Sequence, residues 1–219
     1  MHPLSRVLLL VALAVGLPGL ALAQSGDINK VNGSVLVEAG QSAGKVSTVN
    51  GSVHINANAH VRAASTVNGS IQLGDHATAD TLDTVNGSIT LGADSRVKGA
   101  ASSVNGRMQL APGAEIGGKL SNVNGTITLD RAHVGDGIET VSGDITVGAN
   151  SRVEGGILVN KLTGWFHWNT RTPQIVIGPH AVVQGTLEFR REVVLKVSDS
   201  AQIGPVKGAT VVKFSGTAP

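Results

Sequence analysis

The sequence predicts an all-β protein built as a single parallel β-helix, or β-solenoid, of about nine coils of 18–19 residues each. Three observations support this prediction. The tetrapeptide Val-Asn-Gly-Ser, or a close relative of it, recurs at this nearly constant spacing along most of the chain. Apolar and polar residues alternate after each copy, as they do in a strand that buries one face. The 219 residues include 29 glycines but only two tryptophans, three phenylalanines and no tyrosine, which suits a narrow core of small aliphatic side chains.

Residues 1–23 are predicted to be a secretory signal peptide. A short apolar segment follows a basic start, and Ala21 and Ala23 supply the small residues of a cleavage site before Gln24. The apolar segment is shorter than the roughly 20 residues of a membrane-spanning helix, and Pro18 interrupts it. We therefore expect a periplasmic or secreted protein whose mature chain begins at Gln24. An uncleaved N-terminal anchor is the alternative.

Residues 24–159 are predicted to form the regular part of the solenoid. In each unit, the opening valine and the aliphatic residues four and six positions later are expected to stack from coil to coil inside the rod. A small residue and a branched residue follow, as in Ser95 and Val97. A helix is excluded because the apolar spacing, the glycines and the β-branched residues all oppose it. The tetrapeptide begins at Val31, Val49, Val67, Val85, Val104, Val123 and Val141.

Residues 174–219 are predicted to form the final coils and a C-terminal cap. The segment IVIGPHAVVQG repeats the pattern of ITLGADSRVKG, and LKVSDSAQIGP repeats it again. A last short strand is expected at 211–214, where Phe214 would fold over the final rung. Because the first coil carries no capping segment of this kind, we expect association through the N-terminal edge to be the stronger one.

The repeat is interrupted once, by an aromatic insertion loop at residues 160–173. The chain from one coil to the next is longer here than elsewhere by about two thirds of a coil. Insertions in solenoids project from one face and often carry binding. The insertion is therefore expected to bind a glycan, a partner protein or a membrane surface, or else to form a flap whose rings cover apolar solenoid surface. The candidate binding residues are Trp165, Phe166, Trp168 and Arg171.

Six asparagines of the repeat, each followed by glycine, fall on the same position of successive coils. Because Asn-Gly tolerates a positive φ at a tight corner, we expect a structural corner ladder. Stacked amides can also hydrogen-bond from coil to coil. A ligand-binding row of amides is the alternative. The residues are Asn32, Asn50, Asn68, Asn86, Asn105 and Asn124.

No catalytic residue, metal site or cofactor is predicted. His60 and His133 share nearly one position of the repeat, but four coils separate them by about 19 Å, too far to hold one ion. Arg96 and Glu115 are expected to form a stacked ion pair that helps to fix the register. The absence of cysteine excludes disulfides and thiolate metal sites. The net charge of +2 argues against a general nucleic-acid binder.

The units ITLGADSRVKG, ITVGANSRVEGGI and IVIGPHAVVQG resemble the coils of bactofilins, the bacterial polymer-forming β-helix proteins, over most of residues 26–208. The resemblance implies a right-handed β-helix that polymerises end to end without nucleotide, as a membrane-associated scaffold. Two features differ, because bactofilins are cytoplasmic and their corners are less regular. The repeat is also similar to bacterial putative-adhesin solenoids. Left-handed hexapeptide helices rank second in fold, because they need a small residue where Ile89 stands.

We therefore expect a non-enzymatic structural or scaffolding β-solenoid of the bacterial cell envelope, which self-associates into a homo-oligomer through its terminal coils. The alternative is an adhesin-like binding module that uses the aromatic insertion to bind an envelope protein, a glycan or a membrane surface. A β-helix enzyme of an unrecognised type ranks third. Neither of the first two hypotheses involves nucleic acid, a metal or a cofactor.

Overall fold

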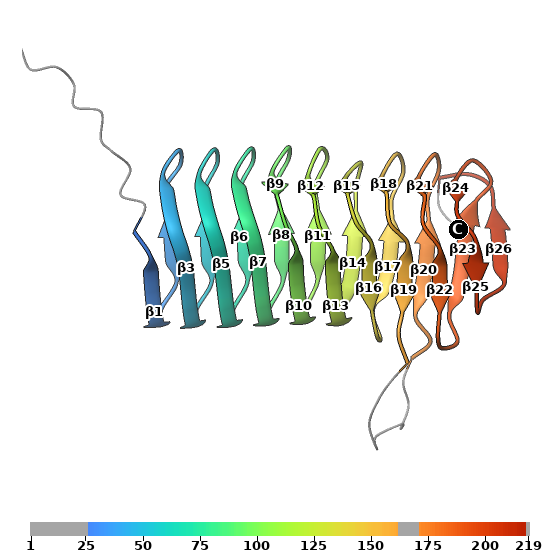
Figure 1. The fold of residues 1–219 in the computed structure, drawn as a ribbon, viewed down its shortest axis with the longest axis horizontal. Helices are drawn as coiled ribbons and strands as arrows, with labels where there is room; N and C mark the ends of the chain where they lie inside the picture. The colour runs from blue at the N-terminus through green and yellow to red at the C-terminus, as the bar shows by residue number, and fades with distance from the viewer. Residues whose placement is uncertain (1–25, 162–170, 218–219) are drawn as a thin grey trace, which may run out of the picture.

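The computed structural model describes residues 26–161 and 171–217, and every helix or strand assigned in these ranges is a β-strand. The chain winds into a straight rod of about ten coils, and the described segments begin and end at opposite ends of it (Figure 1). The all-β solenoid predicted from the sequence is therefore confirmed, with a coil count close to the expected one. The predicted signal peptide and the start at Gln24 lie outside the described residues.

One side of the rod is a ten-stranded parallel sheet to which each coil adds one strand, in chain order. Neighbouring strands are one repeat apart in the sequence, so that Val35 pairs with Val53 and Ile89 with Met108. The offset is larger where Ile145 pairs with Ile175, as the predicted insertion requires. The strands are β2 (Val35–Val37), β4 (Val53–Ile55), β6 (Ile71–Leu73), β8 (Ile89–Leu91), β11 (Met108–Leu110), β14 (Thr126–Leu129), β17 (Asp144–Val147), β20 (Gln174–Ile177), β23 (Val194–Ser198) and β26 (Val211–Phe214).

The rest of the wall is a sixteen-stranded sheet that bends around the other side of the coil. Most of the early coils cross it as one nine-residue strand, whereas the later coils divide it into two shorter strands. The division begins where an extra residue enters between Val97 and Ala101, whose partners are Ala79 and Leu82. The strands are β1 (Ile28–Asn32), β3 (Ser42–Asn50), β5 (His60–Asn68), β7 (Thr78–Asn86), β9 (Arg96–Val97), β10 (Ala101–Asn105), β12 (Glu115–Ile116), β13 (Leu120–Asn124), β15 (His133–Val134), β16 (Ile138–Thr140), β18 (Arg152–Val153), β19 (Ile157–Val159), β21 (Val182–Val183), β22 (Leu187–Phe189), β24 (Gln202–Ile203) and β25 (Val206–Lys207).

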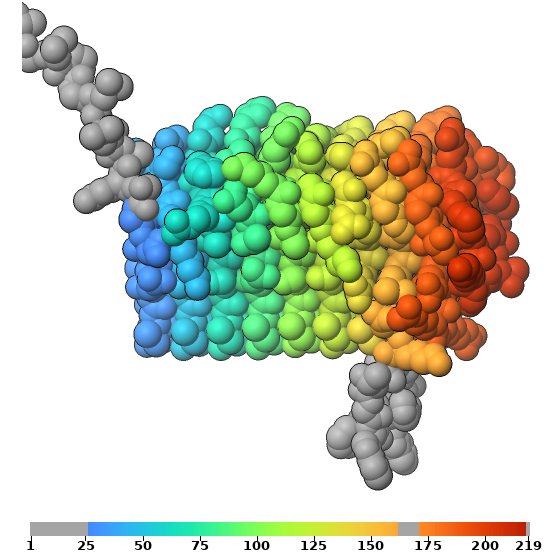
Figure 2. Space-filling model, viewed as in Figure 1, coloured from blue at the N-terminus to red at the C-terminus, as the bar shows by residue number. Residues whose placement is uncertain are grey.

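The core consists of aliphatic ladders that run along the axis of the rod. Ile71, Ile89 and Met108 pair in register on β6, β8 and β11, and each is at most 1% exposed. The small and branched residues predicted to follow them, such as Ser95 and Val97, are also fully buried. Parallel strands at about 4.8 Å spacing leave little room for rings, which explains the shortage of aromatic residues. The coils stack without a break along the rod (Figure 2).

The valine that opens each repeat lies outside this core, contrary to the prediction. Val49, Val67 and Val85 are each 40% exposed. The strand alternation explains this result, because Thr48 just before Val49 points inward and is only 3% exposed. The chain then turns at Asn-Gly before the buried part of the next strand begins. An inner valine ladder at this position is therefore wrong, and an apolar row runs along one outer corner instead.

A second corner follows the strands of the ten-stranded sheet, and at most of these corners one residue has a positive φ. Residues that tolerate the left-handed conformation, such as Asn, Asp and Gly, occupy most of these turns. Two of the histidines lie there and therefore have a conformational role. In the part of the chain that the structure describes, the residues other than glycine with positive φ are Asn58, His76, Asp94, Arg131, Asn150 and His180.

The inward and outward positions of β8 can be tested with one charge. Ile89→Asp should bury an unpaired carboxylate between Ile71 and Met108, whereas Thr90→Asp should place the same group in solvent. We expect Ile89→Asp to lower the free energy of unfolding by more than about 4 kcal/mol, and Thr90→Asp by less than about 1 kcal/mol. Chemical unfolding followed by circular dichroism measures both. Equal stability of the two variants would contradict this assignment of faces.

Candidate functional site

The aromatic insertion leaves the rod at the same corner as the Asn-Gly turns. The backbone amide of Asn160 donates to Thr140 O, one coil back, at 2.9 Å. Asn160 therefore occupies the position that the opening valine of the repeat holds in earlier coils. The chain rejoins the ten-stranded sheet at β20, so the insertion begins and ends at one edge of the rod (Figure 1). The candidate residues Trp165, Phe166 and Trp168 lie outside the described ranges.

Arg171, the fourth candidate, is part of the base of the insertion. Its guanidinium forms an ion pair with Asp144 Oδ2 at 2.6 Å, while 75% of its side chain stays exposed. The other carboxylate oxygen of Asp144 accepts a hydrogen bond from the backbone amide of Gln174 at 2.8 Å. Arg191 also reaches this corner and donates to Val141 O and Arg171 O at 3.1 and 3.4 Å. Arg171 thus anchors the returning chain.

The outgoing end of the insertion is fixed by a second polar network. Asn160 Nδ2 donates to Glu139 at 2.6 Å, and its Oδ1 accepts from Arg190 at 3.0 Å. Lys119 pairs with the other oxygen of Glu139 at 3.1 Å. Arg190 also binds Glu188 at 2.7 Å, and this hydrogen bond and the positive charge of Arg190 lower the pKa of Glu188. Both ends of the insertion are therefore held by charged side chains of neighbouring coils.

The six asparagines of the repeat form one continuous amide ladder. In each step the Nδ2 of one asparagine donates to the Oδ1 of the asparagine one coil earlier, at 2.9–3.1 Å. The serines that follow, from Ser34 to Ser88, add a parallel row in which a backbone amide donates to each hydroxyl. These contacts join each coil to the next through side chains, so the geometry supports a structural ladder.

The glycines after these asparagines are needed for a reason that the sequence reasoning missed. Only Gly33 and Gly125 of the six have a positive φ. At Gly51, Gly69, Gly87 and Gly106, a Cβ would instead overlap the carbonyl oxygen of the glycine one coil earlier. The expectation of a positive φ at every corner is therefore wrong. Close stacking of backbone on backbone explains the regular spacing of these glycines better.

A buried row of polar side chains closes the same corner and was also missed. Thr48, Thr66 and Thr84 are 3–4% exposed, and each hydroxyl donates to a glycine carbonyl of the previous coil at 2.9–3.0 Å. Ser103 and Asn122 make the equivalent bond in later coils. The signal was present in the sequence, because a residue able to donate a hydrogen bond precedes the repeated valine in each of these coils.

The charged column on the opposite sheet links neighbouring coils by an ion pair. Arg96 and Glu115 form the predicted ion pair, at 2.7 Å. His60 and His133 lie on this same column with Thr78, Arg96 and Glu115 between them. Within residues 26–161 and 171–217, no group of three or more histidine or acidic side chains could hold a metal ion. No helix in these ranges is long and apolar enough to cross a bilayer.

No known protein-family model matches this chain, and neither does any curated protein or solved structure.

The glycine corner makes a testable demand. Gly87→Ala should push the backbone of adjacent coils apart, because the new methyl group would meet the rigid carbonyl of Gly69. We expect a loss of about 3 kcal/mol in the free energy of unfolding. Gly26→Ala is the matched control, since its Cβ meets nothing within 4 Å and should change stability by less than about 0.5 kcal/mol. A Gly87→Ala variant as stable as the control would refute the close-approach explanation.

Proposed function

We propose that this protein is a non-enzymatic scaffold of the bacterial cell envelope that self-associates through the ends of its solenoid. The observation that carries the proposal is that both sheets end in strands paired on one side only, among the described residues. At the N-terminal end these are β1 and β2, whose partners are β3 and β4. Strands β24, β25 and β26 are their counterparts at the C-terminal end. An unpaired strand edge is a template for a second chain.

The N-terminal coil offers backbone groups and apolar surface together. The backbone amide of Val35 donates a hydrogen bond to Ser52 O on the next coil, at 2.9 Å. Because alternate residues of a strand donate to opposite sides, the amide of Leu36 is directed to the open edge. The side chains of Val31 and Leu36 are 67% and 52% exposed. A hollow at this end is lined by Ile28, Leu36 and Val37, among others.

Among the described residues, the C-terminal coil also ends in strands that pair on one side only, where the sequence predicts that Phe214 folds over the final rung. The predicted strand forms as β26, but it pairs in register with β23 and is the last rung of its sheet. Ile203, Val206 and Val211 are only partly buried, although their partners Val183, Leu187 and Leu195 are at most 1% exposed. Apolar ladder positions are thus incompletely covered here, so we extend the proposal to association at both ends.

Proline placed on each edge tests the assembly. Leu36→Pro should remove an edge donor at the N-terminal end, and Lys213→Pro should remove one at the C-terminal end. We expect the unmodified protein to form dimers or longer assemblies in light scattering as its concentration rises. If the protein forms a head-to-head dimer, Leu36→Pro should abolish it and Lys213→Pro should not. If the protein forms a filament, each of the two variants should shorten it. Circular dichroism of each variant should show that it remains folded.

Two results would refute the scaffold proposal. The first is an unmodified protein that stays monomeric at high concentration. The second is an assembly that neither proline variant disturbs while both remain folded, since the contacts would then lie away from the coil ends.

The second candidate function is a binding module that acts through the aromatic insertion. It is favoured by the two networks around Asp144 and Glu139, which fix both ends of the insertion and reduce the entropy lost on binding. The double variant Trp165→Ala and Trp168→Ala should then weaken binding to glycans, envelope proteins or anionic-lipid vesicles by about tenfold or more. Thr90→Ala, on an outer face, is the control. Binding that survives the double change would contradict this role, and the oligomeric state should not change.

A further inference from the structure

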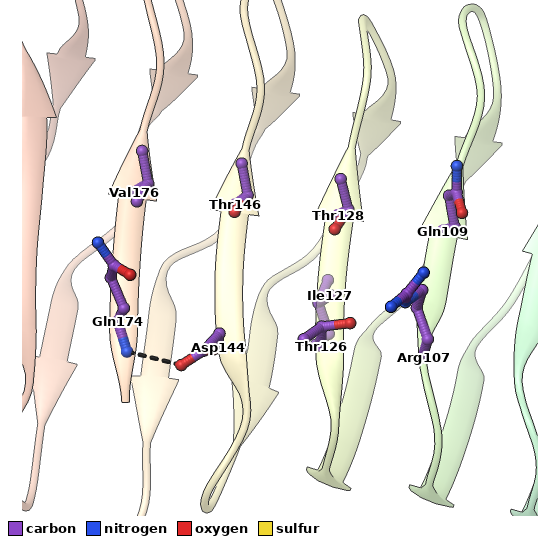
Figure 3. Close-up of a pocket in the computed structure, with 9 residues that line it drawn as sticks. All are labelled: Arg107, Gln109, Thr126, Ile127, Thr128, Asp144, Thr146, Gln174 and Val176. Carbon is purple, nitrogen blue, oxygen red and sulfur yellow. Dashed lines mark hydrogen bonds between the residues drawn. The ribbon is translucent and has the colours of Figure 1, made fainter. Parts of the chain in front are cut away.

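A shallow groove crosses the outer face of the ten-stranded sheet, over β11, β14, β17 and β20 (Figure 3). Each strand contributes two outward positions. Short side chains form the floor, because Thr126, Thr128 and Thr146 stand on the two central strands. Arg107 rises on one side and Gln174 on the other. The groove therefore results from long side chains on the outer strands and short ones between them.

Arg107 stands out among the arginines of the described residues. It replaces the serine of Val-Asn-Gly-Ser and so interrupts the serine row. Its guanidinium makes no ion pair or hydrogen bond within the described ranges, whereas Arg96, Arg171 and Arg190 each pair with a carboxylate. Asp144, the carboxylate that lines the groove, is paired with Arg171 instead, and its other oxygen accepts a hydrogen bond from Gln174 N. A free positive charge thus borders a row of hydroxyl groups.

We propose that this groove binds an extended acidic glycan. A guanidinium can form two parallel hydrogen bonds with a carboxylate, and threonine hydroxyls donate to and accept from sugar hydroxyls. The rungs repeat at about 4.8 Å, close to the length of one sugar ring in an extended β-linked chain. A glycan lying along the rod would therefore meet Thr126 or Thr128 and then Thr146 with successive sugars, with its carboxylate at Arg107.

The charge pattern favours a glycan over a nucleic acid. A nucleic acid carries a phosphate on every unit and is bound by several cations, whereas the groove lining supplies one unpaired arginine among hydroxyls and amides, together with the carboxylate of Asp144, which is paired with Arg171. The inference goes beyond the scaffold proposal, because it assigns a ligand to the side of the rod rather than to its ends. The two can fail separately.

The test compares two sugar oligomers of equal length that differ only in their carboxylates. We would titrate the full chain with a β-linked mannuronate oligomer and with the neutral β-linked mannose oligomer, by calorimetry. The acidic oligomer should bind more tightly, and Arg107→Gln should weaken it by roughly tenfold. Arg62→Gln is the matched control, because Arg62 is an exposed arginine paired with Asp27 in a different sheet. Thr128→Val should weaken binding by about threefold without a loss of stability.

The proposal is overturned if neither oligomer binds or if the neutral one binds equally well. It is also overturned if Arg107→Gln and Arg62→Gln reduce binding equally, since the effect would then be one of overall charge. Light scattering keeps this result apart from the scaffold proposal. Arg107→Gln should assemble as the unmodified protein does, because β11 lies in the middle of the rod.

Discussion

The close stacking of backbone on backbone at the Asn-Gly corner is the constraint on which the rest of the rod depends. A Cβ on Gly69 or Gly87 would overlap the carbonyl oxygen of the glycine one coil earlier. The corners can therefore stack at this distance only when the residue there has no side chain. The Asn amides outside the corner and the Thr hydroxyls inside it then bond from coil to coil. Each coil is thereby held in register at one point, and the apolar ladders follow from that register.

A structure built in this way satisfies its backbone groups along the rod but not at its ends. Every internal strand is paired on both sides, whereas the first and last coils within the described residues are paired on one. Barrels avoid open edges by closing on themselves, and a solenoid needs caps or partners instead. The partly buried Ile203, Val206 and Val211 show that the C-terminal rung leaves apolar surface incompletely covered. The proposed self-association follows from this geometry.

Side chains at the outward positions do not pack in the inner ladders, and the sequence departs from the repeat at these positions. Arg107 and Asp144 each occupy the position of the serine in Val-Asn-Gly-Ser. Asn160, from which the insertion leaves the rod, occupies the position of the valine. None of these changes disturbs an inner ladder. The same coils therefore carry the groove on one face and the base of the insertion at the adjoining corner, where Asp144 contributes to both.

The sequence by itself determined the solenoid, the buried Ile and Leu ladders, the stacking of Asn32 to Asn124 and the pair of Arg96 with Glu115, because a fixed period decides which residues lie above one another. Tertiary structure alone decided that the repeated valine points outward, that most corner glycines avoid a clash, and that Arg107 borders a groove with no partner of its own among the described residues. The period cannot supply these features, since they depend on how sharply the chain turns and on the lengths of side chains on adjacent strands.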